Sequence, residues 1–164
     1  MIFDSEVNKW DMYTSEFDNI IYEKEKLMII IQDTDKNIFG CYINAKIDKY
    51  KYLEKDEWMG ERITDENSFI FSIINNKRSD KMIKMDIKKE ESKFSFTLYE
   101  KECEILFTVG RGHDISIWKQ NYKNQCWCEP ESFNYPEGKE NILVGKIGMK
   151  KYFEVKRFVV IQME

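Results

Sequence analysis

The stretch Phe39-Gly-Cys-Tyr-Ile-Asn-Ala-Lys-Ile47 decides the fold, because an apolar residue stands at every second position along it. Successive side chains of an extended chain point to opposite faces, so this period of two predicts one long strand with a core face and a wetter face. The same period recurs later in the chain and predicts further strands. Their apolar positions are Phe94, Phe96 and Leu98; Cys103, Ile105, Phe107 and Val109; Ile115 and Ile117; and Phe153, Val155, Val159, Ile161 and Met163.

Two other segments, residues 27–31 and 69–74, are apolar on both faces. Strands of this kind are typical of the middle of a fold, so we expect both to lie centrally. The last predicted strand, residues 153–163, carries Arg157 as an interruption of its apolar face.

Turn and helix signals are short. Residues 33–37 form a polar turn that predicts a hairpin, and residues 75–80 form another polar connection. Thr14 or Ser15 is placed to cap a short helix. The apolar positions of that helix, which share one face, are Phe17, Ile20 and Ile21.

A second helical turn is expected near residues 56–59, and short strands otherwise dominate. This pattern predicts a mainly β fold, a sandwich of two antiparallel sheets with a few short flanking helices. The chain has 164 residues and no repeat, low-complexity tract or linker, so we expect a single domain over residues 1–164.

The charge balance is close to neutral, with 26 basic and 30 acidic residues and a net charge of −4. Nucleic-acid-binding domains normally present a basic face, so the balance argues against that class. The apolar runs are too short to span a membrane, and the first residues lack the basic and apolar regions of a signal peptide. No Asn-x-Ser/Thr sequon occurs. Together these features predict a cytoplasmic protein without a transmembrane segment.

Four cysteines are too few for a disulfide scaffold in a chain of this length. Cys41 and Cys103 fall on alternating apolar faces, so we expect both to be buried thiols. Cys126 and Cys128 flank Trp127 and would point the same way in a strand. Exposed thiolates there could be oxidised reversibly by peroxide, and the alternative is a pair of half-buried strand cysteines. No metal site is predicted, because a structural zinc site needs four ligands.

Phe39-Gly-Cys-Tyr42, Phe69-Ile-Phe-Ser-Ile73 and Gly110-Arg-Gly-His-Asp-Ile115 are three blocks of one known pattern. Leu143-Val-Gly145 with Phe153-Glu-Val155 makes a fourth, and the four occur in order over nearly the whole chain. They resemble the Phe-Gly-Gly-Tyr, Phe-Leu-Phe-Ser-Leu, Gly-Gly-Gly-His-Asp-Leu and C-terminal blocks of TLDc domains, the oxidation resistance family.

The resemblance implies a sandwich of two antiparallel sheets and a role in oxidation resistance. It also implies a partner, because several family members bind the V-ATPase and regulate its assembly. No accepted reaction is attached to the domain. The sequence departs from the family at Cys41 and Arg111, where glycines are usual, and at Val159, where an acidic residue is common.

Residues 110–114 are the first candidate site. His113 beside Asp114 has the chemistry of a general base with its orienting carboxylate, but no nucleophile motif accompanies them. Gly110 and Gly112 could form an anion-binding nest to which Arg111 adds charge. The structural alternative is a tight turn whose histidine starts a strand, with Arg111 exposed at the loop tip as a partner contact.

Two further features remain open. Residues 129–136 form an acidic, aromatic loop that either contacts a partner or covers the end of the sandwich. A weaker idea is a small polar ligand, such as a sugar, bound by exposed tryptophans. The candidates are Trp10, Trp58, Trp118 and Trp127.

The first hypothesis is therefore a non-enzymatic, cytosolic protein-interaction domain, with V-ATPase subunits as the partner that the resemblance implies and no cofactor. The alternative is a thiol-based redox protein that reacts with peroxide through Cys126 and Cys128.

Overall fold

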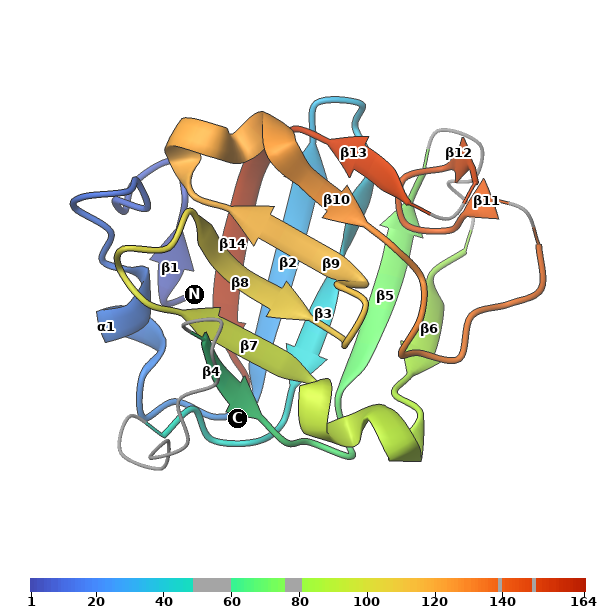
Figure 1. The fold of residues 1–164 in the computed structure, drawn as a ribbon, viewed down its shortest axis with the longest axis horizontal. Helices are drawn as coiled ribbons and strands as arrows, with labels where there is room; N and C mark the ends of the chain where they lie inside the picture. Colours follow the sequence, from blue (N-terminus) through green and yellow to red (C-terminus); the bar gives the residue numbers. More distant parts are fainter. Residues whose placement is uncertain (49–59, 76–80, 139, 149) are drawn as a thin grey trace.

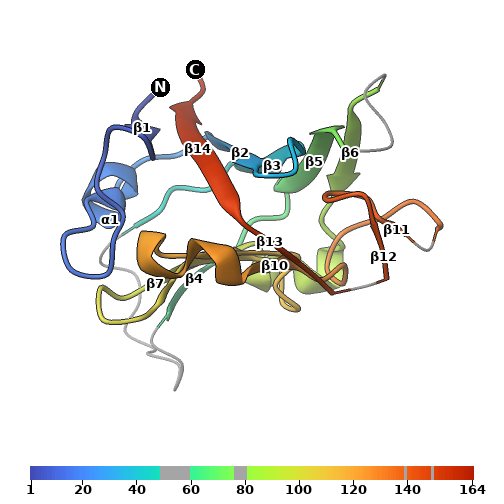
Figure 2. The same ribbon diagram turned by 90° about the horizontal axis from the view of Figure 1, so that it is seen from above.

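The computed structural model describes residues 1–48, 60–75, 81–138, 140–148 and 150–164. Within these residues the chain forms two six-stranded antiparallel sheets that lie face to face, which confirms the predicted sandwich (Figures 1 and 2). The first sheet has the order β1 (Phe3–Asp4), β14 (Val155–Gln162), β2 (Leu27–Asp33), β3 (Ile38–Ile43), β5 (Phe69–Ile74) and β6 (Ile83–Asp86). The second has the order β13 (Lys151–Phe153), β10 (Cys126–Cys128), β9 (Ile115–Trp118), β8 (Ile105–Val109), β7 (Phe96–Tyr99) and β4 (Gly60–Ile63).

The remaining elements lie around the sandwich. The short helix α1 (Phe17–Ile21) stands at one end, and the two-stranded pair β11 (Glu140–Asn141) and β12 (Lys146–Ile147) stands at the other (Figure 2). Two 3₁₀ helices, η1 (Lys89–Phe94) and η2 (Gln120–Gln125), precede β7 and β10.

The core fills the space between the two sheets with apolar side chains from their inner faces. An aromatic cluster joins the layers at the α1 end. The Phe17 and Phe107 rings stack at 5.4 Å, and Phe158 meets Phe3 and Trp10 at 5.1 Å each. All five rings are at least 97% buried. Burying a large apolar side chain contributes about 1.5–3 kcal/mol, so this cluster is a major source of stability.

The predicted hairpin and helix are both confirmed. Asp33 ends β2, and its carboxylate accepts hydrogen bonds from the backbone N–H and side-chain amide of Asn37 at 2.8 and 2.6 Å. Lys36 takes a left-handed conformation between them. Helix α1 buries Phe17 and Ile21, and its cap position is Glu16 rather than Thr14 or Ser15. The Ser15 hydroxyl accepts instead from the N–H of Phe17 at 3.3 Å.

The prediction of one strand over residues 153–163 is wrong in one respect, because this segment forms two strands that belong to different sheets. β13 ends at Phe153 in the second sheet, and β14 starts at Val155 in the first, so the chain crosses the sandwich at Glu154 (Figure 2). A bulge between Val155 and Arg157 then shifts the side-chain phase by one residue. The inward residues beyond the bulge are therefore Phe158 and Val160, not Val159 and Ile161.

Two other sequence expectations need correction. The strand predicted over residues 39–47 ends at Ile43, because the Asp65 carboxylate binds the next two backbone N–H groups, at 2.6 and 3.0 Å. Cys103 lies in a turn before β8 and is only partly buried, whereas Cys41 is fully buried as predicted. Residues 27–31 and 69–74 do lie in internal strands. The helical turn expected near residues 56–59 and most of the connection at residues 75–80 lie outside the described residues.

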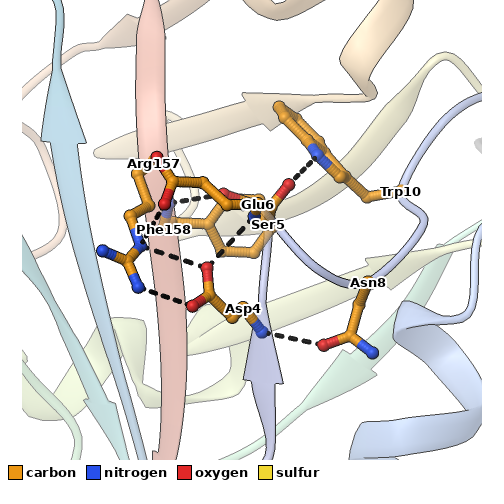
Figure 3. Close-up of polar contacts among 7 residues, drawn as sticks. All are labelled: Asp4, Ser5, Glu6, Asn8, Trp10, Arg157 and Phe158. Atoms are coloured by element: carbon orange, nitrogen blue, oxygen red, sulfur yellow. Dashed lines mark hydrogen bonds and ion pairs between the residues drawn. The ribbon is translucent and has the colours of Figure 1, made fainter.

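A polar clasp joins the first and last strands (Figure 3). The Arg157 guanidinium donates two hydrogen bonds to the Asp4 carboxylate, from Nε at 3.1 Å and from Nη2 at 2.6 Å. The Ser5 hydroxyl accepts from the backbone N–H of Phe158, and the Ser5 carbonyl accepts from the Trp10 indole. Arg157, the polar interruption of the sequence pattern, therefore faces outward and binds β1 to β14.

Candidate functional site

Residues 110–114 form the predicted tight turn between β8 and β9. Gly110 has φ of 80° and His113 has φ of 62°, so both occupy the left-handed region. The N–H of His113 donates to the Gly110 carbonyl and closes the turn at 3.2 Å. An added Cβ on Gly112 would collide with the Glu131 carboxylate, which explains the second glycine.

Asp114 anchors this turn to the 129–136 loop. Its buried carboxylate accepts hydrogen bonds from the N–H groups of Glu131 and Ser132, each at 2.9 Å, and from the Tyr135 hydroxyl at 2.8 Å. Burial raises the pKa of Asp114, and these donors oppose the rise. The carboxylate thus holds a loop in place, which is not the role that a general-base pair requires.

His113 packs its ring against Trp127, with the ring centroids 5.4 Å apart. Burial lowers the pKa of His113, and the nearby Lys150 lowers it further. The imidazole is therefore neutral at pH 7. The structure shows the imidazole packed against Trp127 on the outer face of the second sheet.

Arg111 is exposed, as predicted for the tip of this turn. Its guanidinium lies 3.8 Å from the Glu91 carboxylate and 5.5 Å from the centre of the Phe94 ring. A hollow of about 260 Å³ opens beside it over β4, β7 and β8. Arg62, Tyr99 and His113 are among the residues that line this hollow.

Cys126 and Cys128 point the same way from β10, as predicted, but they point into the core. Both thiols are fully buried. Burial raises the pKa of Cys126 to about 12 and that of Cys128 well above its usual range. The exposed thiolates that the peroxide hypothesis requires are therefore not present in the folded structure.

The 129–136 loop packs onto the sandwich. Ser132 and Phe133 are buried, and Phe133 forms a bridge with Ile87 after β6. The Lys88 ammonium donates to the Glu131 carbonyl at 2.6 Å. A shallow hollow of about 560 Å³ lies along the outside of this loop. Covering one end of the sandwich is thus the structural role of the segment.

The three tryptophans that the structure describes do not form one exposed array. Trp10 is buried in the core, and Trp58 lies outside the described residues. Trp118 and Trp127 are half-buried neighbours on the outer face of the second sheet, 5.7 Å apart. The Lys150 ammonium covers the Trp127 ring at 4.4 Å, so a free stacking surface for a sugar is not evident there.

The outer face of the first sheet is apolar, and the sequence analysis did not identify it as a site. Two cross-strand rows, which we call the apolar face, run side by side across β14, β2, β3 and β5. Aligned by the strand register, the rows are Ile161, Met28, Tyr42 and Phe69, and Val159, Ile30, Gly40 and Phe71.

Aromatic rings make up one end of this apolar face. The Tyr42 and Phe69 rings stack at 5.0 Å, and Phe71 lies 6.3 Å from Phe69. An added Cβ on Gly40 would lie 1.9 Å from the Ile29 carbonyl oxygen and 3.0 Å from the Phe71 ring, so this position has no room for a side chain. The Lys84 ammonium caps Phe69 at 4.5 Å.

No described helix or strand covers the apolar face, which is the upper surface of the sandwich in Figure 2. Except for Phe71 and Gly40, each of its residues keeps part of its surface accessible. Charged pairs border it on both sides, Lys84 with Asp86 on β6 and Asp4 with Arg157 at β1 and β14. The feature of the sequence that indicates this surface is the pair of segments that are apolar on both faces, residues 27–31 and 69–74.

Comparison with models of protein families and with curated proteins finds no match to this chain. Among the described residues, no group of three or more His, Cys, Asp or Glu side chains is arranged to hold a metal ion. In the same part of the chain, the helices are too short and too polar to cross a bilayer.

Proposed function

We propose that this chain is a non-enzymatic protein-interaction domain of the TLDc type that docks on its partner through the apolar face. The observation that supports this most directly is the apolar outer surface of the first sheet, which none of the described helices and strands covers. Antiparallel sheets normally expose polar residues on a solvent-facing side. A contiguous apolar patch with a charged rim is instead typical of a protein-binding surface.

The arrangement of the family-like turn agrees with a binding role rather than a catalytic one. Asp114 is engaged by backbone and tyrosine donors, and His113 packs against Trp127. Neither side chain is thereby placed to activate a nucleophile.

V-ATPase subunits are the partner that the resemblance to TLDc domains proposes, together with a cytosolic role in resistance to oxidative stress. The position of Val159 on the apolar face supports this proposal. It replaces an acid that is common in the family and lies at the β14 end of the apolar face, between Asp4 and Ile30 in register. The departure therefore extends the apolar surface where a family member would carry charge.

The test is an affinity pull-down from the source cell's lysate, with mass spectrometry as the readout. Wild type is compared with Ile161→Lys on the apolar face and with Tyr152→Lys, a matched exchange on the outer face of the second sheet. We expect V-ATPase subunits with wild type and Tyr152→Lys, and their loss with Ile161→Lys. Circular dichroism checks that both variants are folded.

Other outcomes would contradict parts of the proposal. Recovery that survives Ile161→Lys but is lost on Arg111→Glu would move the contact to the 110–114 turn. A wild-type dimer in analytical ultracentrifugation that Ile161→Lys dissociates would show that a second copy occupies the face. No V-ATPase subunit with any bait would exclude this partner.

The redox alternative has a direct test in thiol titration. Cys103 is partly buried in a turn, whereas the other three thiols are fully buried. We expect Cys103 to react first in the folded protein, and the remaining thiols only after unfolding. Selective oxidation of Cys126 and Cys128 by a mild peroxide pulse would instead support the redox alternative.

A further inference from the structure

We propose that an aromatic corner on the outer face of the second sheet binds a methylated ammonium group, either of a small quaternary amine or of a methylated lysine side chain. The aromatic corner consists of Trp127 on β10, Tyr152 on β13 and the Glu129 carboxylate that follows β10, with the His113 ring beside Trp127. It belongs to the other sheet than the apolar face, so the inference goes beyond the docking function proposed above.

Strand register places the two rings of the corner side by side. Trp127 lies directly opposite Tyr152 where β10 pairs with β13. Their neighbours along the strands, Cys126 and Phe153, are buried, so the two rings project outward. The ring centres are 6.3 Å apart and the ring planes meet at 63°, which makes the rings two walls of a corner rather than a flat stack. Tyr152 is 58% exposed, so the corner is open to solvent.

A cation already lies in this corner. The Lys150 ammonium is 4.4 Å from the centre of the Trp127 ring and 5.7 Å from the centre of the Tyr152 ring. The negative face of an aromatic ring attracts a cation within about 6 Å of its centre. The two rings therefore form a place for a cation, and Lys150 marks the position that we assign to the nitrogen of the ligand.

Negative charge surrounds the same place. Glu129 Oε2 lies 3.9 Å from Lys150 Nζ. Burial lowers the pKa of His113, and so does Lys150, which leaves the ring neutral at pH 7 and without repulsion toward a cation. Glu129 and Glu131 act on the pKa of His113 in the opposite direction, so both carboxylates lie near the corner.

The distance to Glu129 favours a methylated ammonium over a primary one. A hydrogen bond joins nitrogen and oxygen at about 2.7–3.2 Å, so at 3.9 Å the Lys150 ammonium is not hydrogen-bonded to this carboxylate. A primary ammonium is strongly hydrated and loses water here without gaining that hydrogen bond. A quaternary ammonium has no N–H to donate, and its methyl groups keep the nitrogen beyond hydrogen-bond distance. Aromatic faces are the surfaces that recognise such groups.

Lys150 is therefore an internal competitor for the site. Its side chain is 41% exposed, and its ion pair with Glu129 is long. Exposed ion pairs of this kind contribute little to stability, so a ligand with a greater affinity for the rings can displace the lysine. Removal of the Lys150 side chain should accordingly strengthen ligand binding.

The test is an NMR titration of the isotope-labelled full chain at constant ionic strength. The probes are tetramethylammonium chloride, a trimethyllysine peptide and its unmethylated form, with sodium chloride as the reference. We expect the indole N–H signal of Trp127 to shift, whereas the signal of Trp10 in the core stays in place. Tighter binding of the trimethyllysine peptide than of tetramethylammonium would identify a methylated side chain as the source, and the reverse order would identify a small quaternary amine.

Two results of this titration would overturn the proposal. One is an indole signal of Trp127 that none of the methylated probes shifts. The other is an unmethylated peptide that binds as tightly as the trimethyllysine peptide, because the site would then not distinguish a methylated ammonium from a primary one.

Variants test the assigned position of the ligand. Trp127→Leu should weaken binding about tenfold or more, because it removes the ring with the shortest contact to the cation. Glu129→Gln should weaken it less, and this change at a partly exposed side chain covers the case in which Trp127→Leu does not fold.

A matched pair of lysine variants tests the competition. Lys150→Ala should strengthen binding, whereas Lys151→Ala should leave it nearly unchanged. Lys151 carries the same charge one residue further along, and its side chain points to the face of β13 opposite Tyr152. Equal strengthening by both variants would show a general effect of charge and would overturn the assigned position.

The outcome is separable from that of the docking proposal. Ile161→Lys alters the apolar face and should keep full binding of the methylated probe. Tyr152→Lys puts a second ammonium into the aromatic corner and should lose this binding, while it keeps the recovery of V-ATPase subunits. Loss of probe binding on Ile161→Lys would contradict two independent surfaces.

Discussion

Gly110 shows how a single residue determines the conformation of the 110–114 turn. Its φ of 80° is easy for glycine and strained for other residues, and an added Cβ would collide with the Asp114 carboxylate. We expect Gly110→Ala to lower the free energy of unfolding by about 1–3 kcal/mol. Urea denaturation measures the loss. The matched control is Gly138→Ala, since nothing lies within 4 Å of a Cβ there and we expect almost no change.

Asp4 is a second residue whose effect can be measured, through the dependence of stability on pH. Hydrogen bonds from Arg157, followed by one from the Glu6 backbone, hold the pKa of Asp4 below its usual range. A lowered folded-state pKa contributes stability above the unfolded pKa, and this contribution is lost as pH falls through the folded pKa.

We therefore expect Asp4→Asn to have a lower Tm than wild type at neutral pH, and the difference to shrink below about pH 4. Thermal unfolding followed by circular dichroism over a pH series gives both values. Asp35→Asn removes an exposed carboxylate 2.9 Å from Lys146 and serves as the control, with little effect expected. A difference between wild type and Asp4→Asn that grows on acidification would contradict this role of the clasp.

At the scale of elements, the bulge in β14 decides which residues of the last strand support the core. Phe158 is buried among Phe3, Phe17 and Trp10, whereas Val159 faces outward. We expect Phe158→Ala to cost about 3–5 kcal/mol and Val159→Ala about 1 kcal/mol or less. Chemical denaturation of the two variants measures both values. The opposite order would mean that the simple alternation of the sequence, without a bulge, is correct.

Elements also determine where charge and apolar surface appear. The outer side of the first sheet carries two apolar rows, and that of the second carries Arg62, Thr97 and Thr108 in register. The same sandwich thus offers two chemically different surfaces. Each is built from adjacent strands, so its residues come from distant parts of the chain.

At the scale of the whole molecule, the first five residues close one end of the sandwich. β1 pairs with β14, and Phe3 stacks on Phe158 and contacts Phe17. Domains are stable by only about 5–15 kcal/mol, and loss of one core phenylalanine costs about 3–5 kcal/mol. We therefore expect deletion of residues 1–5 to lower Tm strongly or to leave the chain unfolded. Deletion of the exposed Glu164 is the control and should change Tm little.

Much of this fold was predictable from local sequence. Period-two alternation placed the strands around Cys41, Phe96 and Ile115, and the turn residues placed the hairpin at residues 33–37 and the turn at residues 110–112. The spacing of Phe17 and Ile21 placed the helix. These signals are local, because backbone geometry alone relates neighbouring side chains to the faces of a strand or helix.

Long-range pairing decided the rest. Alternation identifies an apolar face but does not say what covers it. The sequence therefore could not show that residues 28, 30, 159 and 161 face outward, where no described helix or strand covers them. It could not place the Asp114 carboxylate on the 129–136 loop, or bury Cys126 and Cys128. The crossing at Glu154 and the bulge after Val155 depend on which strands become neighbours. Sheet order and register are properties of distant segments meeting, and only the tertiary structure determines them.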